Sequence, residues 1–388
     1  MASPRRIASV DIVRGLVMGL MMIDHVRETF YLHRQVADPV DLRDAGLALF
    51  FMRAASHICA PAFVLLAGLA AALRRDRRGD GAAATAGYLV RRGLLLILLE
   101  LTVVNFAWTF PYIQPVLYLQ VIWAIGLSMI ALAGLIYLPA GPLLAASLAI
   151  IFGHNLLDPV APPAGPVGRF AWAILHARTW FAPSDGFRFR VSYPVLPYIG
   201  VIGLGYSLGR LYVEGVTPRA RRATLAAAGA ACIGLFLALR PVNLYGERGR
   251  LLLGDSTLAT LASLVNTTKY PPSLLFLMMT LGPTLILLAV AERARGPAAD
   301  AVARFGAAPM VFYVLHLLFL HAVNFAVARA TGTPGLYHFD RIEAAWAATV
   351  GSLVIVCPLT LRVADRLKRV GKPAVPAAAA RSEGAIPW

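Results

Sequence analysis

The sequence predicts an all-α membrane protein, a polytopic bundle of about ten transmembrane helices of about 20 residues each, with both termini in the cytoplasm. The first observation is composition, because the 388 residues are 59% hydrophobic and only 14% charged, with a mean hydropathy of +0.68. A water-soluble enzyme of this length is far less apolar. The second observation is the recurrence of apolar runs of bilayer length, and the third is the placement of the basic residues.

The apolar runs give the order of the elements. The predicted spanning segments are residues 7–32, 47–73, 88–110, 113–138, 143–156, 193–212, 223–239, 273–290, 305–328 and 344–363. The fifth of these segments is the shortest, and its length falls furthest below the length that a bilayer requires. Two amphipathic stretches, 170–180 and 251–265, are more typical of interfacial or re-entrant helices than of spanning ones.

The charge distribution orients the predicted bundle. The formal net charge is +16, and the Lys and Arg residues gather at 74–92, 210–222, 293–304 and 362–372. If the segments alternate in direction, all four clusters lie on one side, so the positive-inside rule predicts that both termini are cytoplasmic. Membrane orientation explains the basic composition, and no nucleic acid partner is expected.

The chain is predicted to form a single transmembrane domain over residues 1–372, followed by a disordered cytoplasmic tail at 373–388. The long segments 158–192 and 240–272 fall on the outer side and are predicted to cover an outward opening. The three cysteines, Cys59, Cys232 and Cys357, have neither paired nor metal-ligand spacing. The sequence therefore predicts neither a disulfide framework nor a metal site.

The first segment carries ionisable residues, which mark a functional site when they lie within a membrane. Asp11, Arg14 and His25 fall on one helical face at about 100° per residue, so this helix is predicted to line a cavity. We assign Asp11 and Arg14 to ligand binding, and Asp24 and His25 to catalysis. The alternative is a helix end that is solvated by water.

The second segment places His57 between Arg53, one turn before it, and Pro61, one turn after it. Pro61 lacks the N–H that would bond the carbonyl of His57, so the helix is predicted to open there toward a cavity. His57 is a second candidate catalytic residue, and Arg53 is a candidate for binding an anion. A proline kink with a structural histidine is the alternative.

The third segment contains Glu100 in an otherwise aliphatic run. Because an unpaired carboxylate is costly in such surroundings, we expect Glu100 to be protonated or paired with a cation such as Arg14 or Arg53. A catalytic acid and a structural ion pair both fit this pattern.

The ninth segment contains His316 and His321, whose spacing of five puts them on different faces and does not fit the metal site of an HExxH motif. His316, beside Tyr313, is a candidate binding residue, and a structural role is the alternative. The sequence also lacks the GxxxxGK[ST] and GxSxG motifs, which disfavours a nucleotide-driven pump and a standard hydrolase.

Two loops carry further candidates for substrate binding. Lys269 and Tyr270 precede a pair of prolines at a helix entrance, where free N–H groups and a lysine favour an anion. Arg190 lies at the outer end of the sixth segment. Because the positive-inside rule does not account for an arginine on the outer side, a role in ligand binding is favoured. Interfacial anchoring is the alternative.

Five sequence blocks occur in order along the chain: RIASVDIVRGLVMGLMMIDHVRETFY, RAASHICAPAFVLLAGLAA, LQVIWAIGLSMIALAGLIYLP, VSYPVLPYIGVIGLGYSLGRLY and NTTKYPPSLLFLMMTLGP. Together they resemble the bacterial membrane proteins grouped with the heparan-alpha-glucosaminide N-acetyltransferase catalytic domain, over residues 6–366. The named enzyme of this family moves acetyl from cytosolic acetyl-CoA to a glucosamine amine across the lysosomal membrane, and a histidine is central to the reaction.

The resemblance implies an acyltransferase of the bacterial inner membrane that has acetyl-CoA as co-substrate, no tightly bound cofactor, and an amino sugar or envelope glycan as periplasmic acceptor. His25 or His57 would then be the base or a transient acetyl carrier, with Arg14 or Arg53 steadying anionic charge. The family's histidine lies between the first two spans, where this sequence has His33 without a matching motif.

The bilayer is the expected partner in every interpretation, and association into a homo-oligomer is compatible with all of them. The chief rival function is a transporter of a small polar or anionic solute, in which the buried histidines and carboxylates form a path without bond making. A scaffold for envelope enzymes is a third alternative.

Overall fold

Long apolar helices form the body of the molecule in a computed structural model, which describes residues 7–30, 46–109, 116–213, 215–254, 256–333, 337–339 and 341–370. Six helical segments of the described chain are long and apolar enough to cross a membrane: Leu49–Arg78, Ala140–Leu157, Pro218–Val242, Leu274–Ala291, Pro309–Thr331 and Ile342–Arg369. The helical membrane architecture is thus confirmed. The number of about ten spans, the position of the termini and the division at residue 372 stay predictions, and the tail at 373–388 lies outside the described residues.

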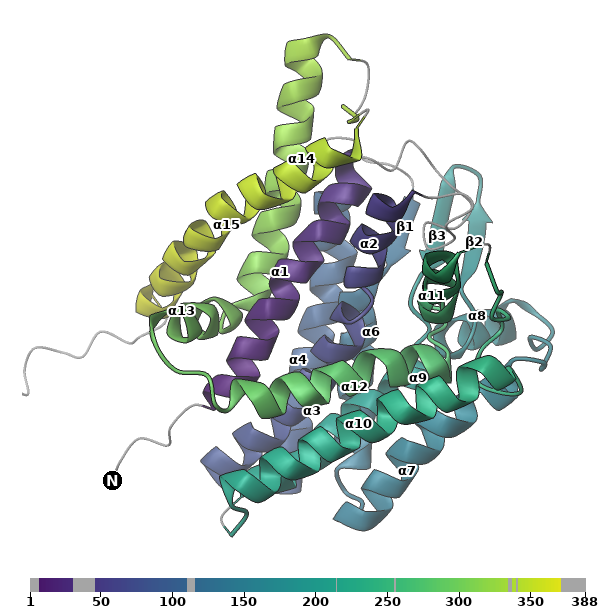
Figure 1. The fold of residues 1–388 in the computed structure, drawn as a ribbon, viewed down its shortest axis with the longest axis vertical. Helices are drawn as coiled ribbons and strands as arrows, with labels where there is room; N and C mark the ends of the chain where they lie inside the picture. The colour runs from purple at the N-terminus through teal and green to yellow at the C-terminus, as the bar shows by residue number, and fades with distance from the viewer. Residues whose placement is uncertain are drawn as a thin grey trace, which may run out of the picture.

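The first predicted segment is helix α1 (Ala8–Phe30), which lies at the centre of the bundle. Its neighbours in the bundle are α2 (Leu47–Ala55), α3 (Cys59–Arg78), α12 (Leu274–Ala291), α13 (Pro297–Gly306), α14 (Pro309–Thr331) and α15 (Ile342–Val370) (Figure 1). Val13, Val17 and Met22 are fully buried. The charged residues of α1 therefore face protein neighbours, as their position in a membrane helix requires.

The second predicted segment is interrupted at the expected place. Helix α2 (Leu47–Ala55) ends before a turn at 56–58, and α3 (Cys59–Arg78) continues beyond it. The backbone N–H groups of Ser56 and His57 bond the carbonyls of Arg53 and Ala54, three residues back. Because Pro61 offers no N–H to the preceding turn, the chain can open here. The predicted break in the helix at His57 is confirmed.

The third and fourth segments are also irregular. Helix α4 (Ala82–Leu99) runs into a π-helical turn, η1 (Glu100–Val104), and then into α5 (Asn105–Thr109). Helix α6 (Val121–Leu135) crosses α4 closely, since a Cβ on Gly93 would lie 2.6 Å from the carbonyl oxygen of Gly126. Small residues at such a crossing let two membrane helices approach each other.

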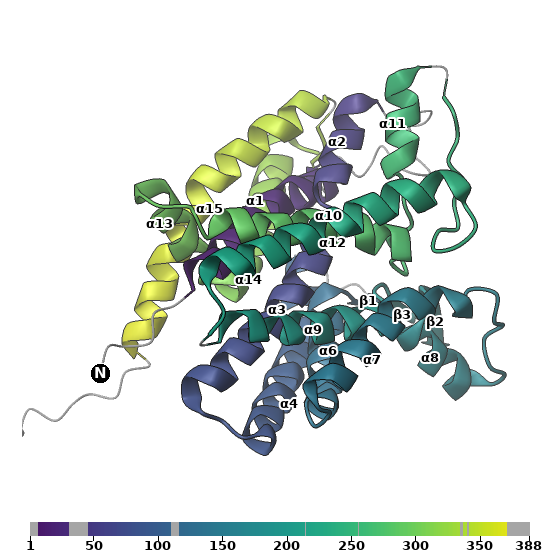
Figure 2. The same ribbon diagram turned by 60° about the horizontal axis from the view of Figure 1, so that its bottom comes forward.

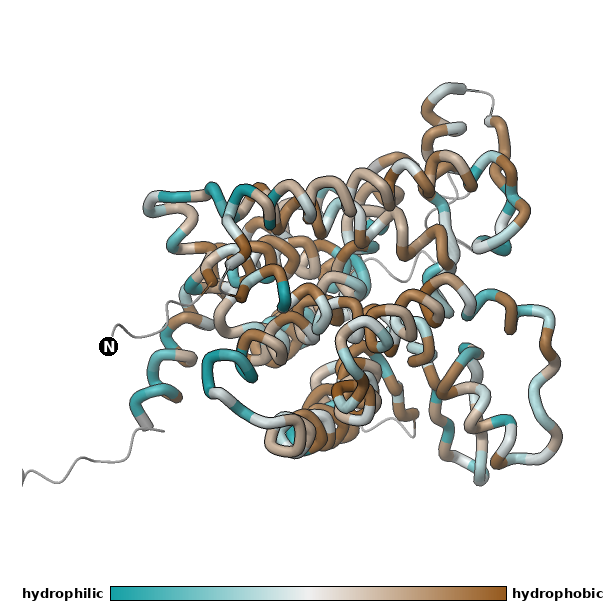
Figure 3. The backbone as a smooth tube through the Cα atoms, turned by 90° about the horizontal axis from the view of Figure 1, so that it is seen from below, coloured by the Kyte–Doolittle hydropathy of each residue, from teal (hydrophilic) through white to brown (hydrophobic). Residues whose placement is uncertain are grey.

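The other predicted segments correspond to single helices or to helices with a short extension. They are α7 (Ala140–Gly153) with η2 (His154–Leu157), α9 (Leu196–Leu208) with η3 (Gly209–Tyr212), α10 (Pro218–Val242), α12 (Leu274–Ala291), α14 (Pro309–Thr331) and α15 (Ile342–Val370). Helix α13 (Pro297–Gly306) precedes α14, so the predicted segment 305–328 starts at the end of α13 and not at the start of α14. Figure 2 shows α10 lying along α12, and Figure 3 shows hydrophilic residues gathered mainly at turns and helix ends.

A small sheet corrects the all-α prediction in one region. Strands β1 (Val116–Leu119), β3 (Phe187–Val191) and β2 (Thr179–Ser184) lie in the order β1-β3-β2, with β1 parallel and β2 antiparallel to β3. The apolar side of β3 packs with Phe170 of α8 (Pro166–Leu175). The alternation FRFRV has the period of a half-buried strand, which a search for helices of bilayer length overlooks.

A second outer segment follows α10 and contains the short helix α11 (Thr257–Val265). Arg240, which is 1% exposed, anchors it. Its guanidinium donates hydrogen bonds to the carbonyls of Leu264, Ser263, Asn266 and Gly249. One buried side chain thus ties the end of α11 to the end of α10.

The two outer segments are joined through Asp158. Its carboxylate accepts hydrogen bonds from His176 at 2.9 Å, from Arg248 at 2.6 Å and from Asn155 at 2.9 Å. The Nδ1 atom of His176 is buried without a hydrogen-bond partner. A proton added there would be buried without an acceptor.

We expect acid to loosen this junction. Burial lowers the pKa of His176, and the hydrogen bond to Asp158 opposes this effect without cancelling it. Burial alone would raise the pKa of Asp158, but hydrogen bonds from Arg248, Asn155 and His176 lower it overall. The contribution of His176 to the free energy of unfolding is therefore complete above pH about 6.5 and is lost as the pH falls through its folded-state pKa. The contribution of Asp158 is lost in the same way at lower pH.

The measurement is limited proteolysis of the segment 158–192 as the pH is lowered from 7 to 5 (a range set by the ordinary histidine pKa of about 6.5). Cleavage of the wild type should accelerate, whereas His176→Gln should show a much weaker pH dependence. An unchanged pH dependence in this variant would contradict the assignment.

Candidate functional site

A cavity of about 390 Å³ lies between α1, α3, α4, α6 and α14. One end is formed by Asp24 and His25 of α1 together with Lys269, and we call it the His25 end. The other is formed by Arg14 of α1 with Arg92 of α4, and we call it the Arg92 end. Because Arg14 and Asp24 are ten residues apart on one helix, the two ends are separated by about 15 Å along its axis.

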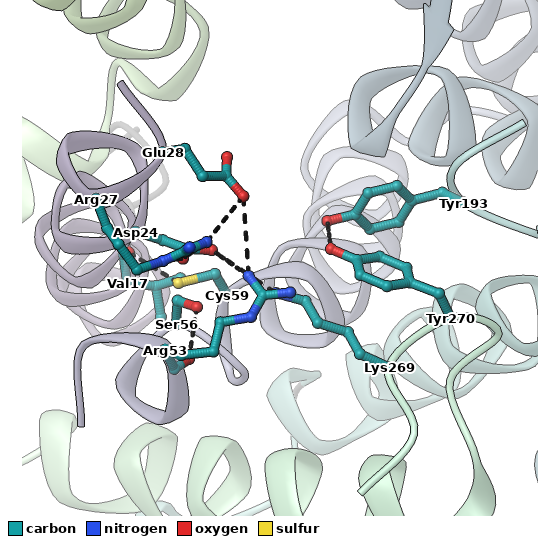
Figure 4. Close-up of polar contacts among 10 residues, drawn as sticks. All are labelled: Val17, Asp24, Arg27, Glu28, Arg53, Ser56, Cys59, Tyr193, Lys269 and Tyr270. Atoms are coloured by element: carbon teal, nitrogen blue, oxygen red, sulfur yellow. Dashed lines mark hydrogen bonds and ion pairs between the residues drawn. The ribbon is translucent and has the colours of Figure 1, made fainter. Parts of the chain in front are cut away.

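A buried charge network closes the His25 end (Figure 4). Asp24 accepts hydrogen bonds from Arg27 at 3.0 Å and from Arg53 at 2.7 Å. The Nζ atom of Lys269 lies 3.8 Å from the same carboxylate. The sequence assigned Asp24 to catalysis together with His25, but the structure directs the Asp24 carboxylate to these cations, since adjacent helical residues point in different directions.

Glu28 is the second carboxylate of this network. It lies 3.1 Å from Arg27 and 3.9 Å from Arg53. Arg27, Arg53 and Lys269 thus face two carboxylates, which leaves one surplus positive charge among these described groups. Such a surplus in a buried site favours a ligand or a reaction intermediate that carries negative charge.

His25 pairs with His316 of α14 across the bundle. The Nδ1 atom of His25 lies 2.5 Å from Nε2 of His316, and the rings are inclined by only 11°. His316 Nδ1 lies 2.8 Å from the carbonyl oxygen of Phe312 and therefore carries a proton, which leaves a lone pair on its Nε2. His25 Nδ1 must then donate, so His25 Nε2 has a free lone pair, as a general base requires.

Aromatic rings hold the orientation of His25. Trp108 of α5 meets it edge-on at 5.0 Å between ring centroids, and Tyr313 does so at 6.1 Å. Tyr313 also contacts His316 edge-on at 5.6 Å, as its place one turn before His316 predicted. The imidazole of His25 is thus fixed from several sides while it lines the cavity.

Lys269 reaches the cavity from the loop before α12. Glu247 shapes this loop by accepting hydrogen bonds from the backbone N–H of Thr268 at 2.9 Å, from its hydroxyl, and from the hydroxyl of Ser273 at 2.7 Å. The next residue, Tyr270, shares a hydrogen bond of 3.1 Å with the hydroxyl of Tyr193. Lys269 and Tyr270 are thereby brought to the His25 end, as an anion-binding loop requires.

The structure does not bring Glu100 to this cavity. Its carboxylate accepts the backbone N–H of Trp123 at 3.1 Å and so satisfies the start of α6. Of the two alternatives predicted for Glu100, the ion pair with Arg14 or Arg53 is not formed, because Arg14 pairs with Asp11 and Arg53 pairs with Asp24. The geometry of the described residues makes Glu100 a capping group, and its Oε1 atom is buried without a hydrogen bond.

His57 is buried behind the wall of the cavity. It is 3% exposed, packs against Phe276 at 5.4 Å between ring centroids, and its Nδ1 has no hydrogen-bond partner in the described chain. Its neighbours Ser56 and Cys59 line the cavity in its place. Of the two candidate histidines, only His25 faces the space in which a substrate can lie.

The Arg92 end is basic and partly open. Arg14 donates to Asp11 at 2.8 Å and to the carbonyl of Gly306 at 3.3 Å. Arg92 is exposed, and Tyr88 lines the cavity with the guanidinium of Arg74 stacked on its ring at 3.8 Å. Asp11 and Arg14 thus stand apart from the catalytic candidates that the sequence placed on the same face.

Two site residues, Arg27 and Glu28, escaped sequence reasoning, although their charge in a membrane helix was a signal. Tyr193, which follows Arg190 at the mouth of the sixth predicted segment, also joins the site. Arg190 lies on the outer sheet and does not line the cavity. Among the described residues, no group of three or more His, Cys, Asp or Glu is placed to hold a metal.

Comparison with known proteins identifies the family. Residues 6–239 match the family described as heparan-alpha-glucosaminide N-acetyltransferase, catalytic, which is more than half of the 388 residues. A search of the curated proteins found no match. The matched region includes His25 and the cavity walls α1, α3, α4 and α6, whereas Lys269 and His316 lie beyond it. The chain is therefore a member of the heparan-alpha-glucosaminide N-acetyltransferase catalytic family, as its sequence blocks predicted.

Proposed function

We propose that this protein is an integral membrane acyltransferase of the bacterial inner membrane that moves acetyl from acetyl-CoA to an amino sugar or envelope glycan. The observation that supports this function best is the single cavity that joins a basic mouth to a histidine with a free ring nitrogen. A donor entering at the Arg92 end would meet an acceptor arriving at the His25 end.

The walls of the cavity suit an acyl-CoA. Arg14 and Arg92 at one end offer guanidinium groups to the phosphates of CoA. Between the ends, Ala60, Ala67 and Ala70 of α3 leave room beside an apolar wall, and an extended pantetheine arm is of comparable length to the separation of the ends. The thioester would then lie beside His25.

In the transfer, the acceptor's amine nitrogen or hydroxyl oxygen attacks the thioester carbonyl carbon. The new C–N or C–O bond forms and the C–S bond breaks, while His25 Nε2 takes the proton of the nucleophile and passes it to the departing thiolate. The products are the acetylated acceptor and CoA with a free thiol. The ammonium of Lys269, which lines the same end of the cavity, would stabilise the oxyanion that develops on the carbonyl.

Sidedness follows from the predicted topology. If both termini are cytoplasmic, the basic cluster at 74–92 is cytoplasmic, and the Arg92 end opens toward cytosolic acetyl-CoA. The outer segments 158–192 and 240–272 then lie over the His25 end on the periplasmic side. Donor and acceptor would meet without either crossing the membrane completely.

Plugging the cavity tests this proposal without removing a polar group. In Ala67→Phe, a ring should fill the passage between the two ends and abolish binding of a labelled CoA thioether by the purified protein in detergent. Ala227→Phe places the same ring on the exposed surface of α10 and should bind like the wild type. Equal binding by both variants, with both folded by size-exclusion chromatography, would contradict a donor site in this cavity.

A further inference from the structure

The outer sheet has one polar face that the mechanism above does not use. Tyr118 of β1, Arg190 of β3 and Trp180 of β2 are direct cross-strand partners, so their side chains share one face in a single row. Arg190 stacks on Trp180 at 5.1 Å. The neighbouring residues Phe189 and Val191 point the other way into the apolar contact with α8.

Two arginines on this sheet and a third directly before β2 have no counter-charge in the described chain. Arg178, Arg188 and Arg190 make no ion pair within 4.0 Å with any described carboxylate. The Nε atom of Arg190 is buried without a hydrogen-bond partner. Burial and the nearby charge of Arg178 both lower the pKa of Arg190. An anion between the guanidinium groups would relieve both effects.

The sheet is continuous with the His25 end of the cavity. Arg178 stacks on the ring of Tyr270 at 4.4 Å, and the Tyr270 hydroxyl bonds that of Tyr193, which lines the cavity. Lys269 lies 5.5 Å from the centre of the same ring. A ligand held on the sheet can therefore extend one of its groups past Tyr270 toward His25.

The chemistry of the face identifies a ligand class. Guanidinium groups bind phosphate and carboxylate through paired hydrogen bonds, and aromatic side chains provide a stacking surface for a small-molecule ring. Trp180 is 45% exposed, and Arg178 is exposed, so the face is accessible. We infer that the Tyr118–Arg190–Trp180 face with Arg178 is an acceptor subsite, which binds a phosphate or carboxylate group of a saccharide whose amine or hydroxyl is acetylated at His25.

This inference rests on the proposed acetyltransferase for the fate of the acceptor, but the binding itself is independent of catalysis. The same oxyanion chemistry is found in the headgroup of an anionic phospholipid, which Arg and Trp near a membrane surface also bind. The test must therefore separate a saccharide phosphate in solution from a lipid phosphate.

The experiment measures the dissociation constants of glucosamine and glucosamine 6-phosphate for the full-length protein in phosphatidylcholine nanodiscs. We expect glucosamine 6-phosphate to bind at least about tenfold more tightly. In Arg190→Gln and Arg178→Gln this preference should fall toward one, and Arg190→Lys should retain part of it. Arg169→Gln, an exposed arginine of α8, is the matched control and should keep the wild-type preference.

Two results would overturn the inference. One is equal affinity of the wild type for the two sugars, or a preference that survives in both glutamine variants. The other is loss of the preference in nanodiscs that contain phosphatidylglycerol, which would show that the face binds lipid.

Acetyl transfer, measured in parallel, separates the two proposals. A retained preference without CoA release contradicts the acetyltransferase alone, whereas CoA release with equal affinities contradicts the subsite alone.

Discussion

Replacing His25 by alanine should lower the rate of acetyl transfer to glucosamine by about 10² to 10⁴-fold, the range typical of a lost general base. The reason is the hydrogen-bond chain from the Phe312 carbonyl through His316, which leaves the lone pair of His25 on the ring nitrogen that is free to face the cavity. The measurement is release of free thiol from acetyl-CoA by purified protein in detergent, with amino sugar present.

The matched control is His321→Ala. His321 is also buried on α14 and lies near Trp108, at 5.9 Å between ring centroids, but it does not line the cavity. The His321→Ala variant should retain most of the activity. The rate of His316→Ala should lie between those of His25→Ala and His321→Ala, because this change removes only the group that sets the tautomer of His25. Full activity in a folded His25→Ala protein would contradict the assignment of the base.

Replacing Asp24 by alanine should have the largest effect on stability. The change leaves Arg27, Arg53 and Lys269 buried beside one remaining carboxylate, Glu28. Loss of one partner from a buried ion pair typically costs about 3 to 5 kcal/mol, because the other charge stays desolvated. The free energy of unfolding, measured by denaturant titration in mixed micelles, should fall by this amount.

Asp365→Ala is the matched control for Asp24→Ala. Asp365 pairs with Lys368 at 3.1 Å on α15, but the two side chains are 63% and 61% exposed. Exposed pairs contribute about 0 to 1 kcal/mol, so this variant should unfold almost like the wild type. If Asp24→Ala proved as stable as Asp365→Ala, the charge network would not be the structural centre described above.

The helical framework could be predicted from the sequence because its signal is local. Most apolar runs of bilayer length correspond to a helix or to a helix with a short extension, although 47–73 is divided between α2 and α3, and 113–138 includes strand β1 before α6. The break at His57 was also predictable, since Pro61 removes a particular hydrogen bond. The strand FRFRV shows the limit of this signal. Its apolar residues alternate with period two inside a long outer segment, so they do not recur with the period of a helix.

The partners of the polar residues could not be predicted, because they depend on contacts between distant segments. His25 and His316 are 291 residues apart, and nothing local to either indicates that they share a hydrogen bond. The charge of Asp24 and Arg53 predicted that both had partners, but not that they were each other's. Glu100 misled for the same reason, since its carboxylate accepts a backbone N–H at the start of α6 and has no cation beside it among the described residues.

The most direct test of the central claim is acetyl transfer across a sealed membrane. Proteoliposomes loaded with glucosamine would receive labelled acetyl-CoA on the outside only. In the molecules whose Arg92 end faces outward, we expect labelled N-acetylglucosamine to form inside while free CoA accumulates outside. Two results would contradict transfer through the cavity. One is product that forms only when donor and acceptor are on the same side of the membrane. The other is glucosamine that crosses the membrane without release of CoA, which would favour a transporter.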